Sequence, residues 1–271
     1  MAQIIPVTSW SVPPEALFLG NEEVHVWRAK LDLQSSCIQS LIQILSADER
    51  TRANRFYFQK DRERFIVARG LLRVILGRYI NMEPSRLQFR YNPYGKPALA
   101  NESGGNGLCF NLSHSDGLAL YAITRGREIG VDIERIRPDL AEGQIAERFF
   151  SPREVKALRS LPPSLQPVGF FNCWTRKEAY IKARGKGLTL PLDQFDVSLV
   201  PGEQAVLLCV SGDPKESSRW SLLDFLPEAG YVAAIAVEGC HWRPKCWQLT
   251  ENMQEPSAPT PYKLSGDPIH R

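Results

Sequence analysis

The stretch Glu128–Arg135 constrains the fold of this chain most. Apolar and polar residues alternate through it, which predicts a strand with one face in a core and one polar face. Asp132 and Glu134 therefore point the same way. Two carboxylates side by side on a strand repel each other unless a cation lies between them. A divalent metal would relieve that repulsion, but so would Arg or Lys side chains on an exposed face, and so short a pattern leaves both interpretations open.

Length and composition indicate a soluble globular protein of one large domain or two modest ones. The 271 residues are 43% hydrophobic, which is enough for a substantial core. No apolar run approaches the roughly 20 residues of a membrane span, and the first residues lack the pattern of a signal peptide. The 6 cysteines have no regular spacing, as is typical of reduced thiols in the cytoplasm. We therefore expect a cytoplasmic protein without a membrane partner, in which Cys240, His241 and Cys246 bind no zinc.

Positive charge is concentrated between Arg50 and Arg90. This segment has 11 Arg and Lys residues against 3 acidic residues, whereas the net charge of the whole chain is only +3. Such a surface attracts an anion, which could be nucleic acid, a phosphorylated small molecule or simply counter-ions in solvent. Arg62, Arg69 and Arg73 share one face of a helix predicted over residues 61–80, and the simplest interpretation is a solvated face.

A third acidic residue of interest lies on a helix predicted over residues 170–183. Phe171, Trp174, Glu178 and Ile181 fall within one broad stripe of this helix. Glu178 is therefore expected among residues that face the core, where a carboxylate is costly without a partner. The alternative is an exposed ion pair between Glu178 and Lys182, which would stabilise the helix by about 0.3–0.5 kcal/mol.

Three other segments carry local signals. Ser46–Glu49 and Ser151–Glu154 have the S-x-x-E form of a capping box, which predicts that a helix begins after each serine. Ser113–Ser115 follows a predicted strand, and its histidine between two serines is a candidate for holding an anion, because all three side chains can donate hydrogen bonds. Residues 251–271 contain 4 prolines and little to bury, so we expect a disordered tail.

Several of these segments occur in the same order in one known family. Together they resemble the Sfp-type 4′-phosphopantetheinyl transferases. The segments that carry the resemblance are Tyr94–Pro97 (Y-G-K-P), Phe110–Ser115 (F-N-L-S-H-S), Gly130–Glu134 (G-x-D-x-E), Phe149–Ser151 (F-F-S), Trp174–Lys182 (W-x-x-K-E-x-x-x-K) and Gly185–Leu188 (G-K-G-L).

The resemblance implies a fold class. The family is α+β, with two similar α+β halves related by a pseudo-two-fold axis and an active site in the cleft between them. In this chain the halves would be residues 1–126, with elements that bind the phosphates of coenzyme A, and residues 127–250, with the metal-binding acids and the catalytic helix. Because both halves are present in one chain, the resemblance also implies a monomer.

The resemblance further implies a reaction. Coenzyme A donates its 4′-phosphopantetheine arm to a serine hydroxyl of an acyl or peptidyl carrier protein, and adenosine 3′,5′-bisphosphate is released. Mg²⁺ prefers oxygen ligands and neutralises the charge of a diphosphate, so a magnesium-dependent transfer suits the acidic residues. The resemblance leaves open whether the carrier serves fatty-acid, polyketide or nonribosomal-peptide synthesis.

Site residues follow from the family by motif position. Asp132, Glu134 and Glu178 would be the ligands of Mg²⁺, and Glu178 and Lys182 the catalytic residues, with Glu178 considered both as a metal ligand and as a general base. Coenzyme A would be held by Arg52, Lys96, Ser113 and His114. Glu49 stands where relatives have a lysine, and the capping box accounts for it.

Two other functions remain as alternatives. Another magnesium-dependent phosphoryl or nucleotidyl transferase would use the same acidic residues without a carrier protein. A nucleic-acid-binding module would use the basic segment between Arg50 and Arg90, but the chain has no helix-turn-helix, zinc-finger or aromatic RNA-binding signature. We therefore expect no nucleic-acid partner.

Overall fold

The computed structural model describes residues 9–100, 107–142 and 144–250. Its helices and strands form a mixed α+β fold, which confirms the predicted class. The tail predicted over residues 251–271 lies outside the described residues.

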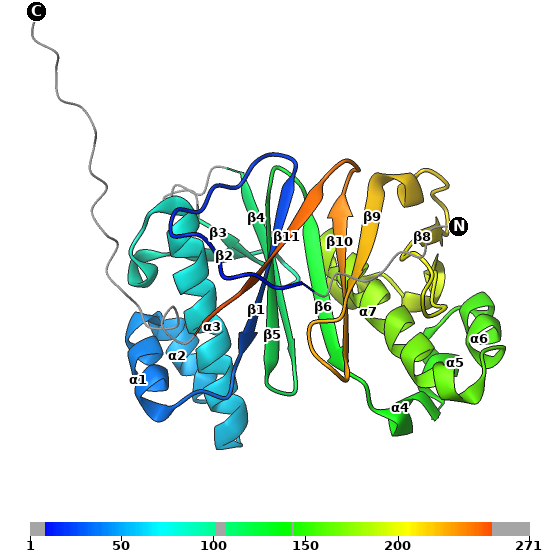
Figure 1. The fold of residues 1–271 in the computed structure, drawn as a ribbon, viewed down its shortest axis with the longest axis horizontal. Helices are drawn as coiled ribbons and strands as arrows, with labels where there is room; N and C mark the ends of the chain where they lie inside the picture. Colours follow the sequence, from blue (N-terminus) through cyan, green and yellow to red (C-terminus); the bar gives the residue numbers. More distant parts are fainter. Residues whose placement is uncertain (1–8, 101–106, 143, 251–271) are drawn as a thin grey trace, which may run out of the picture.

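Two β-sheets occupy the centre of the molecule (Figure 1). The first has the strand order β11-β1-β5-β4 and the second the order β6-β10-β9. Apolar side chains of both sheets form one shared core cluster, which includes Val26, Val131 and Ile235. The strands are β1 (Glu23–Lys30), β4 (Leu108–Ser115), β5 (Leu118–Arg125), β6 (Ile129–Arg135), β9 (Trp220–Phe225), β10 (Tyr231–Glu238) and β11 (Arg243–Gln248).

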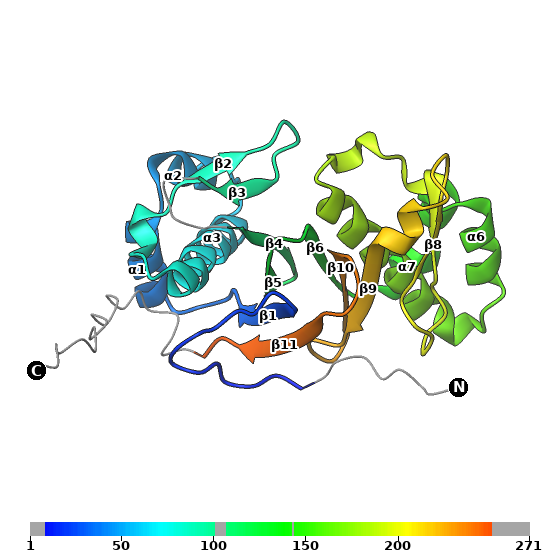
Figure 2. The same cartoon turned by 90° about the horizontal axis from the view of Figure 1, so that it is seen from above.

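Helices cover the outer side of each sheet, so that the molecule has a helical layer at both flanks (Figure 2). The long helices α3 and α7 each pack against one sheet through a separate apolar cluster. The helices are α1 (Ser35–Ile44), α2 (Ala47–Ala53) and α3 (Gln59–Ile80) on the first sheet, and α4 (Pro138–Glu142), α5 (Ile145–Phe149), α6 (Pro152–Arg159) and α7 (Gln166–Arg184) on the second.

The same succession of elements occurs twice along the chain. One strand, short helices, a long helix, a two-stranded hairpin and two further strands run from β1 to β5, and again from β6 to β10. The strand orders β1-β5-β4 and β6-β10-β9 also correspond. The hairpins are β2 (Phe89–Tyr91) with β3 (Pro97–Leu99), and β7 (Phe195–Val197) with β8 (Leu207–Val210).

This repeat is in line with two similar halves, whereas the rotation axis and the division at residue 126 stay predictions. Residue 126 lies in the turn between β5 and β6. One strand departs from a simple division, because β11 comes from the second range but pairs in parallel with β1 of the first. Strand β11 was not predicted from the sequence.

The two sheets meet along β4 and β6, which are bonded through side chains. The Asn111 amide oxygen accepts a hydrogen bond from the Val131 backbone N–H at 2.9 Å. On the face of β6 that also carries Asp132, a Cβ atom at Gly130 would lie 2.1 Å from the Ala179 carbonyl oxygen of α7. Only glycine therefore lets α7 pack this closely, which explains the first residue of G-x-D-x-E.

Local predictions were confirmed at the helix starts and wrong in several other places. Both capping boxes are present, at Ser46 and Ser151. Helix α7 begins at Gln166, earlier than predicted. Arg69 and Arg73, expected on a solvated face, are buried. His114 lies inside β4 rather than after the end of a strand.

Candidate active site

Asp132 is at the centre of the candidate site. It lies on the face of β6 that carries Gly130 and is 3% exposed. One carboxylate oxygen accepts the Ser113 hydroxyl at 2.8 Å and the Lys182 amino group at 2.5 Å. The other oxygen, Oδ2, is buried and is left without a hydrogen-bond partner among the described residues. A buried carboxylate oxygen of this kind is available to a cation.

Glu134 lies two residues further along the same face of β6. Its carboxylate accepts a hydrogen bond from the Ser115 hydroxyl at 2.7 Å. Burial, and then the negative charge of Asp132, raise the pKa of Glu134. Ser115 was not predicted as a partner of Glu134, although residues two apart on a strand point to the same side and Ser113 was already a candidate.

Helix α7 brings Glu178 and Lys182 to these acids. Glu178 is half-buried, and burial, followed by the charge of Asp132, raises its pKa, whereas Lys182 acts in the opposite direction. The Lys182 amino group also donates to the Ser113 hydroxyl at 3.0 Å. Its ion pair is with Asp132 across the β6–α7 packing, not the exposed i,i+4 pair with Glu178 that served as the alternative.

The three acids fit a divalent metal by their chemistry. All supply carboxylate oxygens, which Mg²⁺ prefers. Repulsion from Asp132 acts on both glutamates, and Asp132 Oδ2 has no hydrogen-bond partner among the described residues. In the described part of the chain, however, no three His, Cys, Asp or Glu side chains are drawn together as closely as a bound metal requires. The assignment of Asp132, Glu134 and Glu178 as metal ligands therefore stays a prediction.

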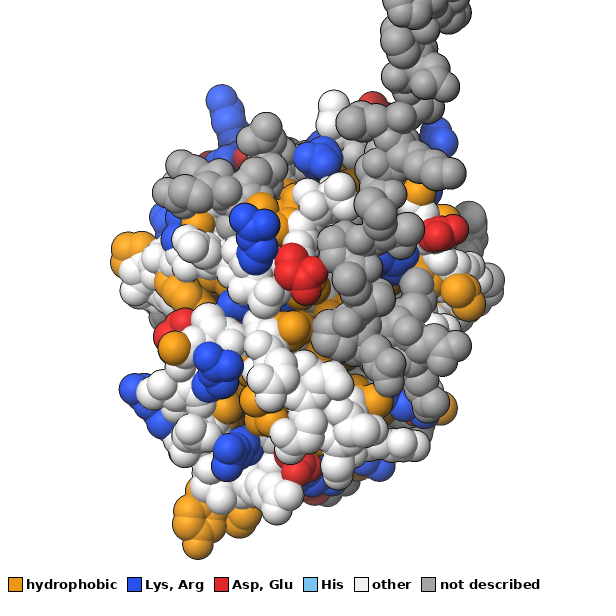
Figure 3. Space-filling model, turned by 90° about the vertical axis from the view of Figure 1, so that its left-hand side faces the viewer, with side chains coloured by type: hydrophobic (Ala, Val, Ile, Leu, Met, Phe, Trp, Pro, Cys, Tyr) orange, Lys and Arg blue, Asp and Glu red, His pale blue; other side chains and the backbone are white. Residues whose placement is uncertain are grey.

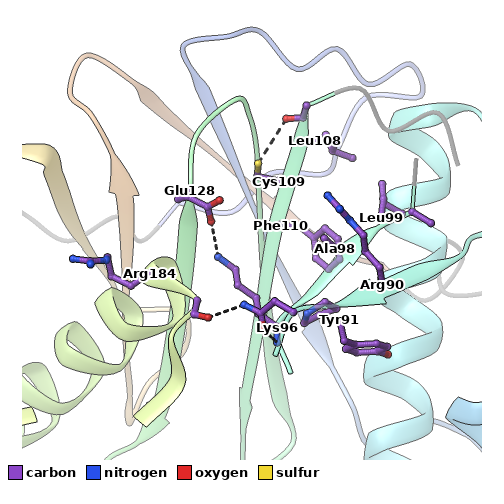
Figure 4. Close-up of a pocket in the computed structure, with 15 residues that line it drawn as sticks. Arg90, Tyr91, Lys96, Ala98, Leu99, Leu108, Cys109, Phe110, Glu128 and Arg184 are labelled. Atoms are coloured by element: carbon purple, nitrogen blue, oxygen red, sulfur yellow. Dashed lines mark hydrogen bonds and ion pairs between the residues drawn. The ribbon is translucent and has the colours of Figure 1, made fainter. Parts of the chain in front are cut away.

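A cavity of about 670 Å³ lies at the start of β6, where it is lined by Glu128, four residues before Asp132. Its lining comes from the β2–β3 hairpin, the start of β4 and the end of α7 (Figure 4). Lys96 reaches across it and donates to Glu128 at 2.9 Å and to the carbonyl oxygens of Ile129 at 3.1 Å and Ala183 at 3.0 Å. Lys96 thereby connects the hairpin to β6 and α7, and Arg90 and Arg184 add positive charge to the lining.

The other predicted coenzyme A residues are not gathered in one place. Ser113 and Ser115 face the β6 acids, so His114 between them points to the opposite side of β4. The expectation that all three hydrogen-bond donors meet one anion was therefore wrong in its geometry. Arg52 lies on α2 in the outer helical layer, where its guanidinium stacks on Phe65 at 5.5 Å.

Comparison with known proteins identifies the family. A profile described as 4′-phosphopantetheinyl transferase superfamily matches residues 128–236, and one described as 4′-phosphopantetheinyl transferase, N-terminal, matches residues 30–125. The protein 4′-phosphopantetheinyl transferase HetI of Nostoc sp. is 45% identical over 239 residues, which cover 88% of this chain and 98% of the relative. The chain belongs to the 4′-phosphopantetheinyl transferase superfamily.

The Sfp type of this superfamily is the appropriate subdivision. The protein 4′-phosphopantetheinyl transferase Sfp of Bacillus subtilis is 34% identical over 198 residues, covering 73% of this chain and 84% of Sfp. A phosphopantetheinyl transferase of Thraustochytrium sp. is 29% identical over 208 residues, covering 72% of this chain and 70% of the relative. The resemblance read from the motifs is thus confirmed, and the chain is an enzyme of this class.

Proposed function

We propose that the chain transfers the 4′-phosphopantetheine arm of coenzyme A to a serine of acyl or peptidyl carrier proteins, with Mg²⁺ as cofactor and adenosine 3′,5′-bisphosphate as the second product. The observation that carries the proposal is the approach of α7 to β6. It brings Glu178 and Lys182 to the buried, incompletely paired Asp132. Family membership supplies the reaction, and this geometry supplies groups that suit it.

Three acids would hold the metal in this proposal: Asp132, Glu134 and Glu178. When bound, Mg²⁺ would neutralise negative charge on the diphosphate of coenzyme A. Burial, and then the negative charge of Asp132, raise the pKa values of Glu134 and Glu178, so a cation would stabilise the charged form of these carboxylates. The negative charge of the three carboxylates would therefore favour binding of Mg²⁺, and bound Mg²⁺ would in turn stabilise the charged carboxylates.

Glu178 would also receive the proton of the carrier serine. The serine oxygen forms the new bond to the β-phosphorus, the bond from that phosphorus to the bridging oxygen breaks, and the bisphosphate leaves with that oxygen. A raised pKa makes the Glu178 carboxylate a better base, whereas coordination to a metal would lower the pKa again. Both roles remain within the proposal, with direct or water-mediated proton transfer.

Lys182 would stabilise the negative charge on the transferring phosphoryl group. Its half-buried amino group already lies on Asp132, and a lysine acts there as a compact positive charge. We assign Lys96, Ser113, His114 and Arg52 to coenzyme A. Lys96 borders the cavity between the hairpin and α7. Its three hydrogens are used by Glu128, Ile129 and Ala183, so a phosphate group would replace the exposed Glu128 carboxylate as one of the acceptors.

The basic segment is weaker support for a nucleic-acid-binding function than its sequence indicates. Two of its arginines, Arg69 and Arg73, are buried against Glu49 and so are withheld from phosphate groups. On the visible part of the helical flank, Lys and Arg side chains lie scattered among apolar and neutral surface rather than in one patch (Figure 3). Each helix in the described ranges is too short or too polar to cross a membrane.

The experiment that tests the proposal is intact-protein mass spectrometry. An apo acyl carrier protein and an apo peptidyl carrier domain are each incubated with this protein, coenzyme A and Mg²⁺. We expect a mass gain of one phosphopantetheine arm, which disappears when EDTA replaces Mg²⁺. Protein that binds coenzyme A but modifies neither carrier would contradict the proposal and favour another acceptor.

A further inference from the structure

Lys177 directly precedes Glu178 in the W-x-x-K-E motif, yet its amino group is completely buried. It forms an ion pair with Glu154 at 2.8 Å and donates to the carbonyl oxygens of Leu192, at 2.7 Å, and Phe195. An ammonium group has three hydrogens to donate, and these three acceptors use all of them. Lys177 therefore has no hydrogen left for a substrate.

Glu154 extends this arrangement to two further segments. As the third residue of the capping box, it accepts the Ser151 backbone N–H at 2.9 Å. Its other oxygen accepts the Val197 backbone N–H of β7 at 2.8 Å. One buried ion pair thus joins the start of α6, the middle of α7 and the segment that leads into β7.

The first half of the chain has the same arrangement around a different cation. Glu49 of the first capping box accepts the Ser46 backbone N–H at 3.0 Å and pairs with Arg73 at 2.7 Å. Arg73 then donates to the carbonyl oxygens of Pro84 and Leu87, which precede β2. In each half, one buried ion pair therefore joins a capping box, a long helix and the segment before the following hairpin. We call this arrangement the clamp.

We propose that Lys177 is a positioning residue for the transfer reaction. Held by Glu154 and two backbone carbonyls, it fixes how far α7 is rotated and advanced over β6, and so directs the neighbouring Glu178 towards Asp132. Lys182, one turn later, reaches the site itself. The two lysines of K-E-x-x-x-K therefore have separate roles, one in the support and one in the site. This inference rests on the proposed function.

The clamp predicts a particular effect of losing Lys177. Removing one partner of a buried ion pair leaves an uncompensated charge, which strongly destabilises a protein, whereas removing both partners costs much less. If Lys177 only balances charge, removing Glu154 as well should restore both stability and kcat. If Lys177 positions α7, kcat should stay low in the double variant, because the bonds to Leu192 and Phe195 remain lost.

The test compares Lys177→Met, the double variant Glu154→Gln/Lys177→Met and Lys177→Arg with the matched control Arg73→Met. For each we would measure Tm, kcat, the KM for coenzyme A and for the carrier, and amide hydrogen exchange in α7, at a temperature where all are folded. We expect Lys177→Met to lower kcat at least tenfold, to leave both KM values within twofold, and to speed exchange in α7.

The remaining variants separate positioning from general instability. The double variant should regain most of the lost Tm while its kcat stays low. Arg73→Met should lose Tm but keep kcat within twofold, and Lys177→Arg should recover kcat relative to Lys177→Met, because an arginine fills this place in the first half.

Three results would overturn the inference: a normal kcat in Lys177→Met, recovery of kcat together with Tm in the double variant, or an equal fall of kcat in Arg73→Met. If the wild-type enzyme modifies no carrier, the proposed function fails. Hydrogen exchange still decides the clamp in that case, since unchanged exchange in α7 of Lys177→Met would refute it.

Discussion

The two halves of the molecule share one arrangement of a first strand packed on a long helix, but they carry different side chains at that contact. Arg73 of α3 and Lys177 of α7 both pair with a capping-box glutamate, and by their spacing from these two residues Val74 and Arg78 correspond to Glu178 and Lys182. Arg78 and Lys182 in turn meet Trp27 of β1 and Asp132 of β6. In the first half the cation stacks over an indole, with Arg78 at 5.5 Å from the Trp27 ring. In the second half the cation pairs with a carboxylate.

This difference shows that the fold does not itself create the site. Trp27 is fully buried, and its indole N–H donates to the Tyr79 hydroxyl at 2.8 Å, so the first strand–helix contact is closed. The second contact has a similar backbone arrangement but holds acids that repel one another. The buried pairs Glu49–Arg73 and Glu154–Lys177, by contrast, are present in both halves. These buried ion pairs are thus common to both halves, whereas the acids of the candidate site belong to the second half only.

The largest difference between the halves is expected between Glu178→Gln in α7 and Val74→Ala at the corresponding position of α3. Because Glu178 is proposed as ligand and base, we expect transfer to fall by about 10²–10⁴-fold, the range for loss of a general acid or base. Val74→Ala removes methyl groups from the corresponding place on α3 and should lower Tm only. Carrier mass and circular dichroism measure the two effects, and near-normal turnover in folded Glu178→Gln would remove Glu178 from the site.

A second test removes each of the two corresponding cations, Lys182 and Arg78, in turn. Lys182→Met should lower kcat about 10²-fold, as expected when a group that stabilises transition-state charge is lost. Arg78→Met should leave kcat within twofold and lower Tm, because it loses the stacking on Trp27 and hydrogen bonds to the Pro14 and Glu15 carbonyls. Equal losses of kcat in the two variants would mean that both strand–helix contacts serve catalysis.

A third test concerns the two faces of β4. If His114 binds the 3′-phosphate from the face opposite Ser113, then His114→Ala should raise the KM for coenzyme A about fivefold, the size of one hydrogen bond. The KM for dephospho-coenzyme A should hardly change. Exposed His241→Ala is the control, and equal effects of His114→Ala on the two donors would show that His114 does not contact this phosphate.

The smallest expected effect is on stability without metal. The folded-state pKa of Glu134 is raised above its value of 4.5 in the unfolded chain, so the stability that its proton provides is complete below pH 4.5 and is lost as pH rises through the folded pKa. In EDTA at pH 7.5, Glu134→Gln should therefore have a Tm roughly 2–4 °C above wild type.

That gain should vanish as the pH falls towards 4.5, where the wild-type carboxyl is also neutral. Addition of Mg²⁺ should stabilise wild type more than Glu134→Gln, because a ligand that binds the folded state raises its stability. Exposed Glu203→Gln removes the same charge and should show neither effect. A Glu134→Gln variant that is less stable than wild type at pH 7.5 would contradict the account of the acidic face.

Local chemistry made part of the fold predictable. Each capping box satisfies backbone donors within four residues, and both were recognised. Gly185 ends α7 with a φ of 62°, a conformation that glycine adopts without strain. The alternation in β6 was likewise read directly, because strand periodicity is a property of neighbouring residues.

Long-range partners were not predictable in the same way. The arginines of α3 have the sequence pattern of a solvated face, yet Arg69 and Arg73 are buried because Glu49 folds back onto them. Strand β11 escaped notice because its charged and aromatic residues, RPKCWQ, have no clear alternation. It exists through pairing with β1, which lies at the other end of the chain. Nor did the sequence indicate which faces His114 and Ser113 occupy until β4 was seen to continue through both.

By itself, the sequence determined the family, the α+β class and the residue types of the candidate site, since these follow from motifs and from periodicity within short segments. The tertiary structure decided which groups meet. It paired Lys182 with Asp132 rather than with Glu178 and buried the Lys177 amino group against Glu154. It also filled the contact between β1 and α3 with the Trp27 indole, whereas the corresponding contact between β6 and α7 holds acids. These outcomes depend on the packing of residues far apart in the chain, and burial and charge neutralisation are properties of that packing alone.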